Sequence, residues 1–271
     1  MLKEINMTRW LKHLFLGIVI GLTGVIVHLS PAGLWMEEKF GLYWLFHLRG
    51  TVAAPDNVVV VAIDQPSAFR FNLPTAPQLW PREIHARLIE QLTQAGASII
   101  VFDLIFDTPS AIAAYDQKLA LRMRTAGNIV LVERLVYEDT ASTDANEQNY
   151  NRIVKEGPIP LLPLIADAVQ ARAPFPLPKK ERVNHYWVFK TDAGDIPTIP
   201  TVVLQIFALP LYEDFIRLLR IVNPAYAARL PISKDVTDIE DLIFTLRDLF
   251  LNEPGLAHRL KNELNRDANL N

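Results

Sequence analysis

The chain of 271 residues contains no cysteine. A disulfide framework, a zinc site with cysteine ligands and a catalytic thiol are therefore excluded. The chain also has no surplus of basic residues, because 27 lysines and arginines face 30 aspartates and glutamates, for a net charge of −3. This balance gives no indication of a nucleic-acid partner. Half of the residues are hydrophobic, so a sizeable core can form and global disorder is not expected.

Common catalytic motifs are also missing from the sequence. It has no glycine-rich phosphate loop, no G-x-S-x-G elbow and no H-E-x-x-H pair. The six histidines are scattered singly, without the spacing of metal ligands. We therefore predict no cofactor, no metal and no catalytic machinery on this chain.

A long apolar run lies near the N-terminus. Residues 14–29 read LFLGIVIGLTGVIVHL, and His28 is their single weakly polar interruption. With the apolar residues on either side the segment reaches the roughly 20 residues that a bilayer core requires. We predict a transmembrane signal anchor at 14–35, behind a cytoplasmic N-terminus at 1–13. Basic residues ahead of the run place the bulk of the chain outside the cytoplasmic membrane: Lys3, Arg9, Lys12 and His13.

The residues of this segment permit two further interpretations. Ser30-Pro31-Ala32 is a small-residue stretch at which a signal peptide could be cleaved before Gly33. An uncleaved anchor is favoured, because the apolar run is long for a signal peptide. Small residues also recur on one side of the helix, at Gly17, Gly21 and Gly24, and such spacing permits close approach of a second helix in a homodimer.

Beyond residue 57 the pattern predicts a parallel α/β sheet. Apolar runs at 58–64, 98–106 and 128–135 are typical of strands buried on both faces. A helix should follow Pro81, with Gly96 as its stop, and a second should run from an Asp116 cap to Gly127. Their expected inward positions are Ile84, Leu88, Leu92 and Ala95 in the first helix, and Leu119, Met123 and Ala126 in the second.

The rest of the chain has weaker patterns. Residues 138–151 are polar and predict a surface loop, 161–172 a helix, 183–190 a strand, 192–195 a turn and 201–209 a short apolar helix. Residues 210–271 alternate apolar and charged positions at helical spacing, which predicts two or three amphipathic helices. The fold class is thus an α/β fold: a parallel or mixed sheet with flanking helices, preceded by one transmembrane helix and followed by amphipathic helices.

Acidic residues stand at the ends of the first two predicted strands. In parallel sheets, ligands bind beyond the carboxyl ends of the strands, where Asp64, Asp103 and Asp107 would lie. Clustered carboxylates suit a hard cation or a phosphoryl group. The alternative, which we favour, is that Asp64 and Asp107 accept hydrogen bonds from amides of their own loops. Arg82 and His85, one turn apart after Pro81, could face the same edge.

A series of short motifs runs from residue 47 to residue 135: HLRG at 47–50, PDNVVVVAIDQPS at 55–67, WPREIHARLIEQL at 80–92, GASIIVFDLIF at 96–106, D-x-x-L-A at 116–120 and GNIVLVERL at 127–135. In order and spacing they resemble the type-2 CHASE domain, the cyclase/histidine-kinase-associated sensory extracellular module of bacteria. The resemblance is good over 45–135 and looser over 158–209. It places the family's signature positions at Asp64, Ser67, Trp80, Pro81, Arg82, His85, Gly96, Asp103 and Asp116.

Three departures from the family's pattern stand beside this resemblance. The loop before Trp80 lacks the usual glycine, and 211–271 shows no returning strand that ends in Ile-Gly. In the family, further membrane helices and a cytoplasmic cyclase or kinase usually follow the domain, and 210–271 shows neither. We therefore expect either a truncated chain or a member that signals through another polypeptide.

The leading hypothesis is a non-catalytic, membrane-anchored, periplasmic sensory domain at 45–209, followed by a helical segment at 210–271. Its partners would be the membrane, an unidentified small-molecule or protein stimulus, and a second copy or a signalling protein. Its expected ligand surface comprises Asp64, Ser67, Arg82, His85, Asp103 and Asp107. One alternative is an exported metal-assisted hydrolase that uses Asp64 and Asp103. Another is an assembly subunit whose C-terminal helices dock on a partner's apolar groove.

Overall fold

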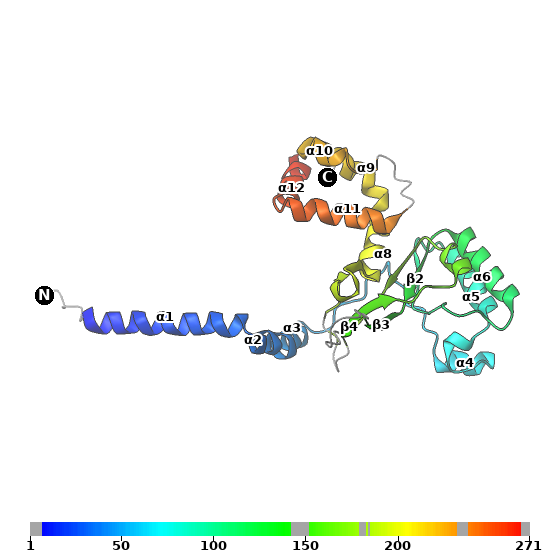
Figure 1. Cartoon of the computed structure of the whole chain (residues 1–271), viewed down its shortest axis with the longest axis horizontal. Coiled ribbons are helices and arrows are strands. Elements are labelled where there is room, and N and C mark those ends of the chain that lie inside the picture. Colours follow the sequence, from blue (N-terminus) through cyan, green and yellow to red (C-terminus); the bar gives the residue numbers. More distant parts are fainter. Residues whose placement is uncertain (1–6, 142–151, 179–182, 184, 232–237, 267–271) are drawn as a thin grey trace, which may run out of the picture. The chain divides into compact units, whose positions relative to one another are not determined.

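The structure, a computed structural model, describes residues 7–141, 152–178, 183, 185–231 and 238–266. The chain divides into two compact units. One comprises residues 1–61 with 179–185, and the other comprises residues 62–178 with 186–271. Figure 1 shows the elements of both units, coloured along the sequence.

The first unit is dominated by helix α1 (Met7–Leu29). Its stretch Trp10–Leu29 has a mean hydropathy of 1.9 and no buried residue, so length and composition suffice to cross a membrane. The predicted anchor is therefore present as a candidate span. It ends at Leu29 rather than at residue 35, because Ser30 and Pro31 interrupt the helix.

A tight turn joins α1 to α2 (Pro31–Met36). The Ser30 hydroxyl donates to the Val27 carbonyl oxygen at 2.6 Å and accepts from the Gly33 amide at 3.1 Å. A Cβ atom on Gly33 would lie 1.8 Å from that same Val27 oxygen, so the turn requires glycine. After α2 the chain stays helical, as the π-helix η1 (Glu37–Gly41) and α3 (Leu42–Arg49).

The prediction of a first strand at 58–64 is wrong. Residues 58–63 pair with no other strand among the described residues, and the side chains of Val59 and Val60 are 81% and 87% exposed. Valine runs favour an extended backbone, but a strand exists only where a partner takes its hydrogen bonds. Helix α4 (Gln65–Phe71) begins directly after this segment.

The second unit is built on a parallel sheet of three strands in the order β1-β2-β5. The strands are β1 (Ile100–Phe102), β2 (Ile129–Glu133) and β5 (Ala171–Pro174). The first two confirm the predictions at 98–106 and 128–135. The third corrects the predicted helix at 161–172, where only α7 (Pro163–Ala166) is helical. Pairing with β2 overrides the helical preference of this alanine-rich segment.

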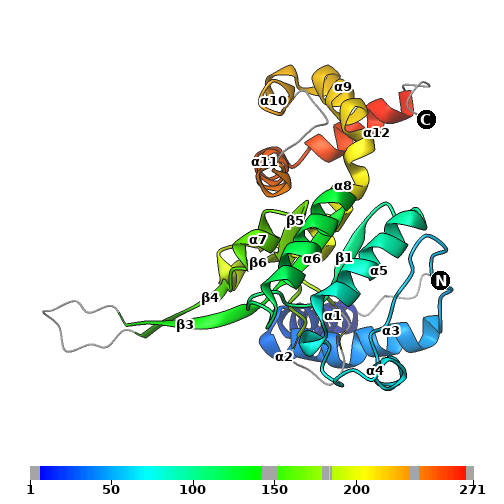
Figure 2. The ribbon, with the colours of Figure 1, turned by 90° about the vertical axis from the view of Figure 1, so that its right-hand side faces the viewer.

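Helices cover both faces of this sheet, as Figure 2 shows from the side. Ile129 and Leu131 of β2 face α5 (Arg82–Gln94) and α6 (Ala113–Ala126). Val130 and Val132 face α8 (Ile199–Ala208) and α11 (Ile239–Asn252). These four side chains are at most 5% exposed, as the alternation of a strand buried on both faces requires.

The helices before and after β1 agree closely with the sequence. Both end where a glycine takes a positive φ, at Gly96 (84°) and Gly127 (71°). Leu119 and Met123 are fully buried as predicted. On α5 the deepest positions are His85, Ala86 and Ile89, while Leu88 and Leu92 contribute to the same core from its border. The predicted inward position of Ala95 is wrong, because α5 ends at Gln94 and Ala95 is exposed.

Two hairpins replace features that the sequence suggested differently. The predicted loop at 138–151 is partly an antiparallel pair, β3 (Leu135–Ala141) with β4 (Arg152–Pro158); residues 142–151 lie outside the described residues. The predicted strand at 183–190 is reduced to β6 (Phe189–Lys190), which turns through η3 (Thr191–Ala193) into β7 (Ile196–Pro197). The hydroxyls of Thr198 and Thr201 donate hydrogen bonds to backbone carbonyl oxygens just before β6. These carbonyl oxygens are the acceptors that a neighbouring strand would use.

The C-terminal segment is helical, as predicted. Its helices are α9 (Tyr212–Val222), the short α10 (Pro224–Ala227), α11 and α12 (Leu256–Arg266). Their apolar sides form a core of their own, with Leu219 and Leu256 fully buried. The remaining short elements are η2 (Pro77–Leu79) and η4 (Leu209–Leu211).

Candidate functional site

Asp64 and Ser67 engage each other at the start of α4. The Asp64 carboxylate accepts hydrogen bonds from the Ser67 amide at 2.9 Å and from its hydroxyl at 2.6 Å. These two bonds lower the pKa of Asp64. The capping role that the sequence favoured for Asp64 is therefore confirmed.

Arg82, in contrast, is buried and surrounded by partners. Its guanidinium lies 3.3 Å (Nε to Oδ1) from Asp116, donates to the Thr108 carbonyl at 2.8 Å and stands 4.5 Å above the Phe106 ring. Only 7% of the Arg82 side chain and 8% of the Asp116 side chain are exposed. Burial lowers the pKa of Arg82, while the charges of Asp116 and Asp107 oppose that shift.

His85 lies one turn further along α5 and is also buried. Its ring stacks on Trp80 at a centroid distance of 6.4 Å and meets the edges of Phe102 and Phe106. Burial, helped by the positive charge of Arg82, lowers the pKa of His85 to about 4. The imidazole is therefore neutral at pH 7, and its Nδ1 atom has no hydrogen-bond partner in the described structure.

Three aspartates near β1 have different surroundings. Asp103 is exposed, and Asp107 pairs with Arg134 at 2.7 Å (Oδ2 to Nη2). The loop-amide role expected for Asp107 is therefore wrong, and Asp116 takes the Ser110 amide at 2.9 Å instead. The predicted cap at Asp116 is also wrong, because α6 already begins at Ala113. The carboxylate of Asp116 points back to the loop and to Arg82.

The structure thus brings together Arg82, His85 and Asp107, and it adds Asp116 to them. We call Arg82, His85, Phe106 and Asp116 the buried arginine cluster. Among the described residues no hydrogen bond or ion pair joins Asp64 or Ser67 to this cluster. Ligand binding by the six expected residues stays a prediction.

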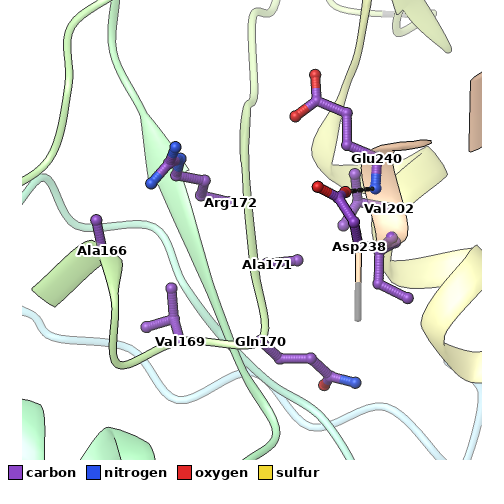
Figure 3. Close-up of a pocket in the computed structure, with 9 residues that line it drawn as sticks. Ala166, Val169, Gln170, Ala171, Arg172, Val202, Asp238 and Glu240 are labelled. Carbon is purple, nitrogen blue, oxygen red and sulfur yellow. Dashed lines mark hydrogen bonds between the residues drawn. The ribbon is translucent and has the colours of Figure 1, made fainter. Parts of the chain in front are cut away.

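A second polar region, which the sequence did not indicate, lies along β5. Two adjoining pockets, with volumes of about 220 and 150 Å³, share Arg172 of β5 and Glu240 of α11. Figure 3 shows the smaller one, with Gln170 and Arg172 on the side of β5 and Asp238 and Glu240 at the start of α11. Asp238 caps α11 by accepting from the Glu240 and Asp241 amides at 2.9 and 3.1 Å.

Glu133, the last residue of β2, lines the larger pocket. Its Oε1 atom lies 3.1 Å from Nε of Arg172. Burial raises the pKa of Glu133 and that of Glu240, and the charge of Arg172 opposes both shifts. We call Glu133, Arg172 and Glu240, with the pockets that they line, the β5 pocket. It is open and charged, whereas the buried arginine cluster is closed.

Sequence reasoning missed this pocket because no local pattern connects its members. The pattern at 161–172 predicts a helix around Arg172, and hydrophobic periodicity does not show that the helix of Glu240 packs against the sheet. A signal was nevertheless present in Glu133, an acid at the end of a strand of four buried residues. Its position at the carboxyl edge of the sheet marks it by the same rule that singled out Asp64.

Arg247 and Lys190 fix α11 and the β6–β7 hairpin beside this pocket. Arg247 of α11 pairs with Asp195 and lies 4.3 Å above the Phe189 ring. Lys190 of β6 lies 3.0 Å from the carboxylate of Glu156 on β4 (Nζ to Oε2). Helix α11 is therefore held near its middle by the charged contact of Arg247 as well as by its apolar side.

The described residues bear on both alternative hypotheses. Among residues 7–141, 152–178, 183, 185–231 and 238–266, no three His, Asp or Glu side chains group as metal ligands would. The C-terminal helices bury their apolar sides against one another. The large apolar side chains that α9 and α11 leave exposed are Ile221, Phe250 and Leu251.

Comparison with known proteins gives one match. Residues 18–238 match the family model of the CHASE2 domain. The match begins within α1 and ends just before α11, so α11 and α12 lie beyond it. No curated protein and no solved structure matches the chain.

Proposed function

The chain belongs to the CHASE2 family of extracellular sensory domains of signalling proteins, and from this premise we propose that it is the membrane-anchored input domain of a bacterial signal-transduction protein of the adenylate cyclase or histidine kinase type. In this proposal α1 lies in the cytoplasmic membrane, the α/β unit is periplasmic, and the chain itself is non-catalytic. Any cyclase or kinase activity would belong to a partner or to further sequence.

The observation that carries the proposal is the apolar helix at residues 10–29. None of its residues is buried, although its mean hydropathy is 1.9, and it precedes a unit with a complete core of its own. A helix that is apolar all round is stable only in an apolar surrounding, which a bilayer provides. Basic residues on its N-terminal side favour export of the segments after the helix.

Topology reporters test the proposal. A phosphatase that is active only in the periplasm and a galactosidase that is active only in the cytoplasm would be fused, separately, after Asn271. We expect only the phosphatase fusion to be active. Deletion of residues 14–29 serves as the control and should abolish that activity. An active galactosidase fusion on the intact chain would contradict the proposal.

A single helix can pass a signal inward only if ligand binding changes its position or its association with a partner. We propose association of two copies through the glycine side of α1. A Cβ atom added at Gly17, Gly21 or Gly24 would have no other atom within 4 Å, so a second helix has room there. Gly21→Leu should weaken cross-linking of the full-length chain in membranes, and Leu22→Val, on another side of the helix, should not. Equal cross-linking of both variants would exclude this contact.

A further inference from the structure

The β5 pocket lies where parallel sheets bind their ligands. Glu133 and Pro174, the last residues of β2 and β5, both line its larger cavity of about 220 Å³. Ligands of parallel sheets sit beyond the carboxyl ends of the strands, where loops and helix ends can supply polar groups. Here the first turn of α11 supplies them.

The charges of this pocket do not balance. Arg172 is its one cation among the lining residues, and Glu133 already pairs with it at 3.1 Å. The Glu133 side chain is only 10% exposed, so this carboxylate has little access to water. Glu240, an exposed residue of α11, adds a second carboxylate to both cavities, and Asp238, also exposed, contributes a third to the smaller one. A negative charge in a partly desolvated pocket is best compensated by a cation.

The walls of the larger cavity are apolar. They are formed by Pro158, Pro160, Leu161, Ala173, Pro174, Ile196 and Pro197. Four of these seven are prolines, which carry no backbone N–H group and lose no side-chain freedom when a ligand packs on them. The pocket therefore offers a carboxylate end and a rigid hydrocarbon wall, the two features that bind an amine with an alkyl chain.

We propose that the β5 pocket binds a small organic cation through its alkylammonium group, which donates hydrogen bonds to Glu240 and Glu133 while its hydrocarbon part packs on the proline wall. This inference rests on the proposed sensory function and names the class of its stimulus. Glu240 lies beyond the residues that match the CHASE2 family, so the site depends on a helix that the family match does not include.

Binding at this place would also affect the position of α11. The helix reaches the sheet through Ile239 and Ile243, and Glu240 lies between them in sequence. A cation held between Glu240 and Glu133 joins α11 to β2, so it binds the docked arrangement of α11 better than any other. A ligand shifts an equilibrium by that difference in affinity.

The experiment measures binding of butylammonium to the full-length chain in detergent micelles by isothermal titration calorimetry. We expect saturable binding, which tetramethylammonium, a cation without N–H donors, and neutral butanol do not reproduce. Glu240→Gln should weaken it at least tenfold, and Glu133→Gln should also weaken it. Glu213→Gln, at an exposed position of α9 that does not line the pocket, removes the same charge and should leave the affinity unchanged. Circular dichroism checks that each variant is folded.

Three outcomes would overturn the inference: no saturable binding to the folded wild-type chain, equal affinity of wild type and Glu240→Gln, or equal affinity for tetramethylammonium. The amino acid 2-aminohexanoate, which has the same alkyl chain, distinguishes an amine from an amino acid as the source of the ammonium group. The reporter fusions decide the proposed function separately. An exported domain that does not bind butylammonium retains the sensory function and loses this ligand, whereas a cytoplasmic domain loses the sensory function whatever it binds.

Discussion

Arg82 and Arg172 both stand beside carboxylates of the α/β unit, yet their surroundings are opposite. The Arg82 side chain is 7% exposed and is paired with Asp116, Thr108 and the Phe106 ring. The Arg172 side chain is 51% exposed, and it has one buried carboxylate, Glu133, at its Nε atom and a second, Glu240, across a pocket. An arginine next to an acid therefore stabilises the fold in the case of Arg82, and it forms part of an accessible site in the case of Arg172.

The two arginines differ in how far neighbouring side chains fill the space beside the guanidinium group. Around Arg82, Phe102, Phe106 and Trp80 fill the space beside the guanidinium and beside His85. Around Arg172, a pocket remains open, and four prolines form much of its apolar wall. Charged residues in a family signature can thus serve packing, while a site can form from residues that no signature contains.

The largest effect should come from breaking the buried pair. Asp116→Ala leaves Arg82 charged and buried, so we expect the free energy of unfolding to fall by about 3–5 kcal/mol. Urea denaturation of the full chain in micelles measures it. The double variant Arg82→Met/Asp116→Leu replaces the pair by apolar side chains and should recover most of that loss. If the double variant is no more stable than Asp116→Ala, an unpaired buried charge is not the cause of the loss of stability.

His85 should make stability depend on pH. Its pKa is about 4 in the folded chain and 6.5 in the unfolded chain, so between these values the unfolded chain binds the additional proton. Stability is therefore lost as the pH falls from about 6.5 towards 4. Between pH 7 and pH 5 the contribution should be about 2 kcal/mol. His85→Leu should abolish this part of the pH dependence in urea melts, and an unchanged slope would show that the imidazole is not buried.

Breaking the open pair should cost far less. Glu133→Gln removes the partner of Arg172, but this guanidinium is half exposed and stays hydrated. We expect a loss of about 1 kcal/mol or less in the same urea measurement. A loss as large as that of Asp116→Ala would erase the contrast between the two arginines and would make the β5 pocket a structural element.

The smallest effect should follow a change at Asp103. This signature residue is exposed beyond β1. Asp103→Ala should change the free energy of unfolding by less than about 0.5 kcal/mol. A stimulus that loses potency in this variant, with stability unchanged, would support the predicted ligand surface and would favour it over the β5 pocket.

Much of the core was predictable because its signals are local. The apolar strand 128–135, the glycines at 96 and 127, and the inward Leu119 and Met123 each carry their own pattern. The cap at Asp64 needed only residues three apart. The failures concern partners distant in sequence. The valines at 58–61 have every local property of a strand, and the segment around Arg172 resembles a helix until β2 pairs with it.

Partners distant in sequence also limit how much of the two candidate sites can be predicted. Arg82 and His85 were found from their order in the chain, but their burial depends on Phe106, Asp116 and Trp80, which come from other segments. Glu133, Arg172 and Glu240 are brought together only by the pairing of β5 with β2 and the docking of α11 on the sheet. Sequence spacing contains neither fact.

The turn at Gly33 has a mechanical consequence. Because the Gly33 backbone lies against the Val27 carbonyl oxygen, and Ser30 is bonded to both residues, α1 and α2 are joined without slack. A rotation of α1 about its axis must therefore move α2 together with it as one rigid piece. Replacing this glycine by any larger residue would convert a stiff coupling into a loose one.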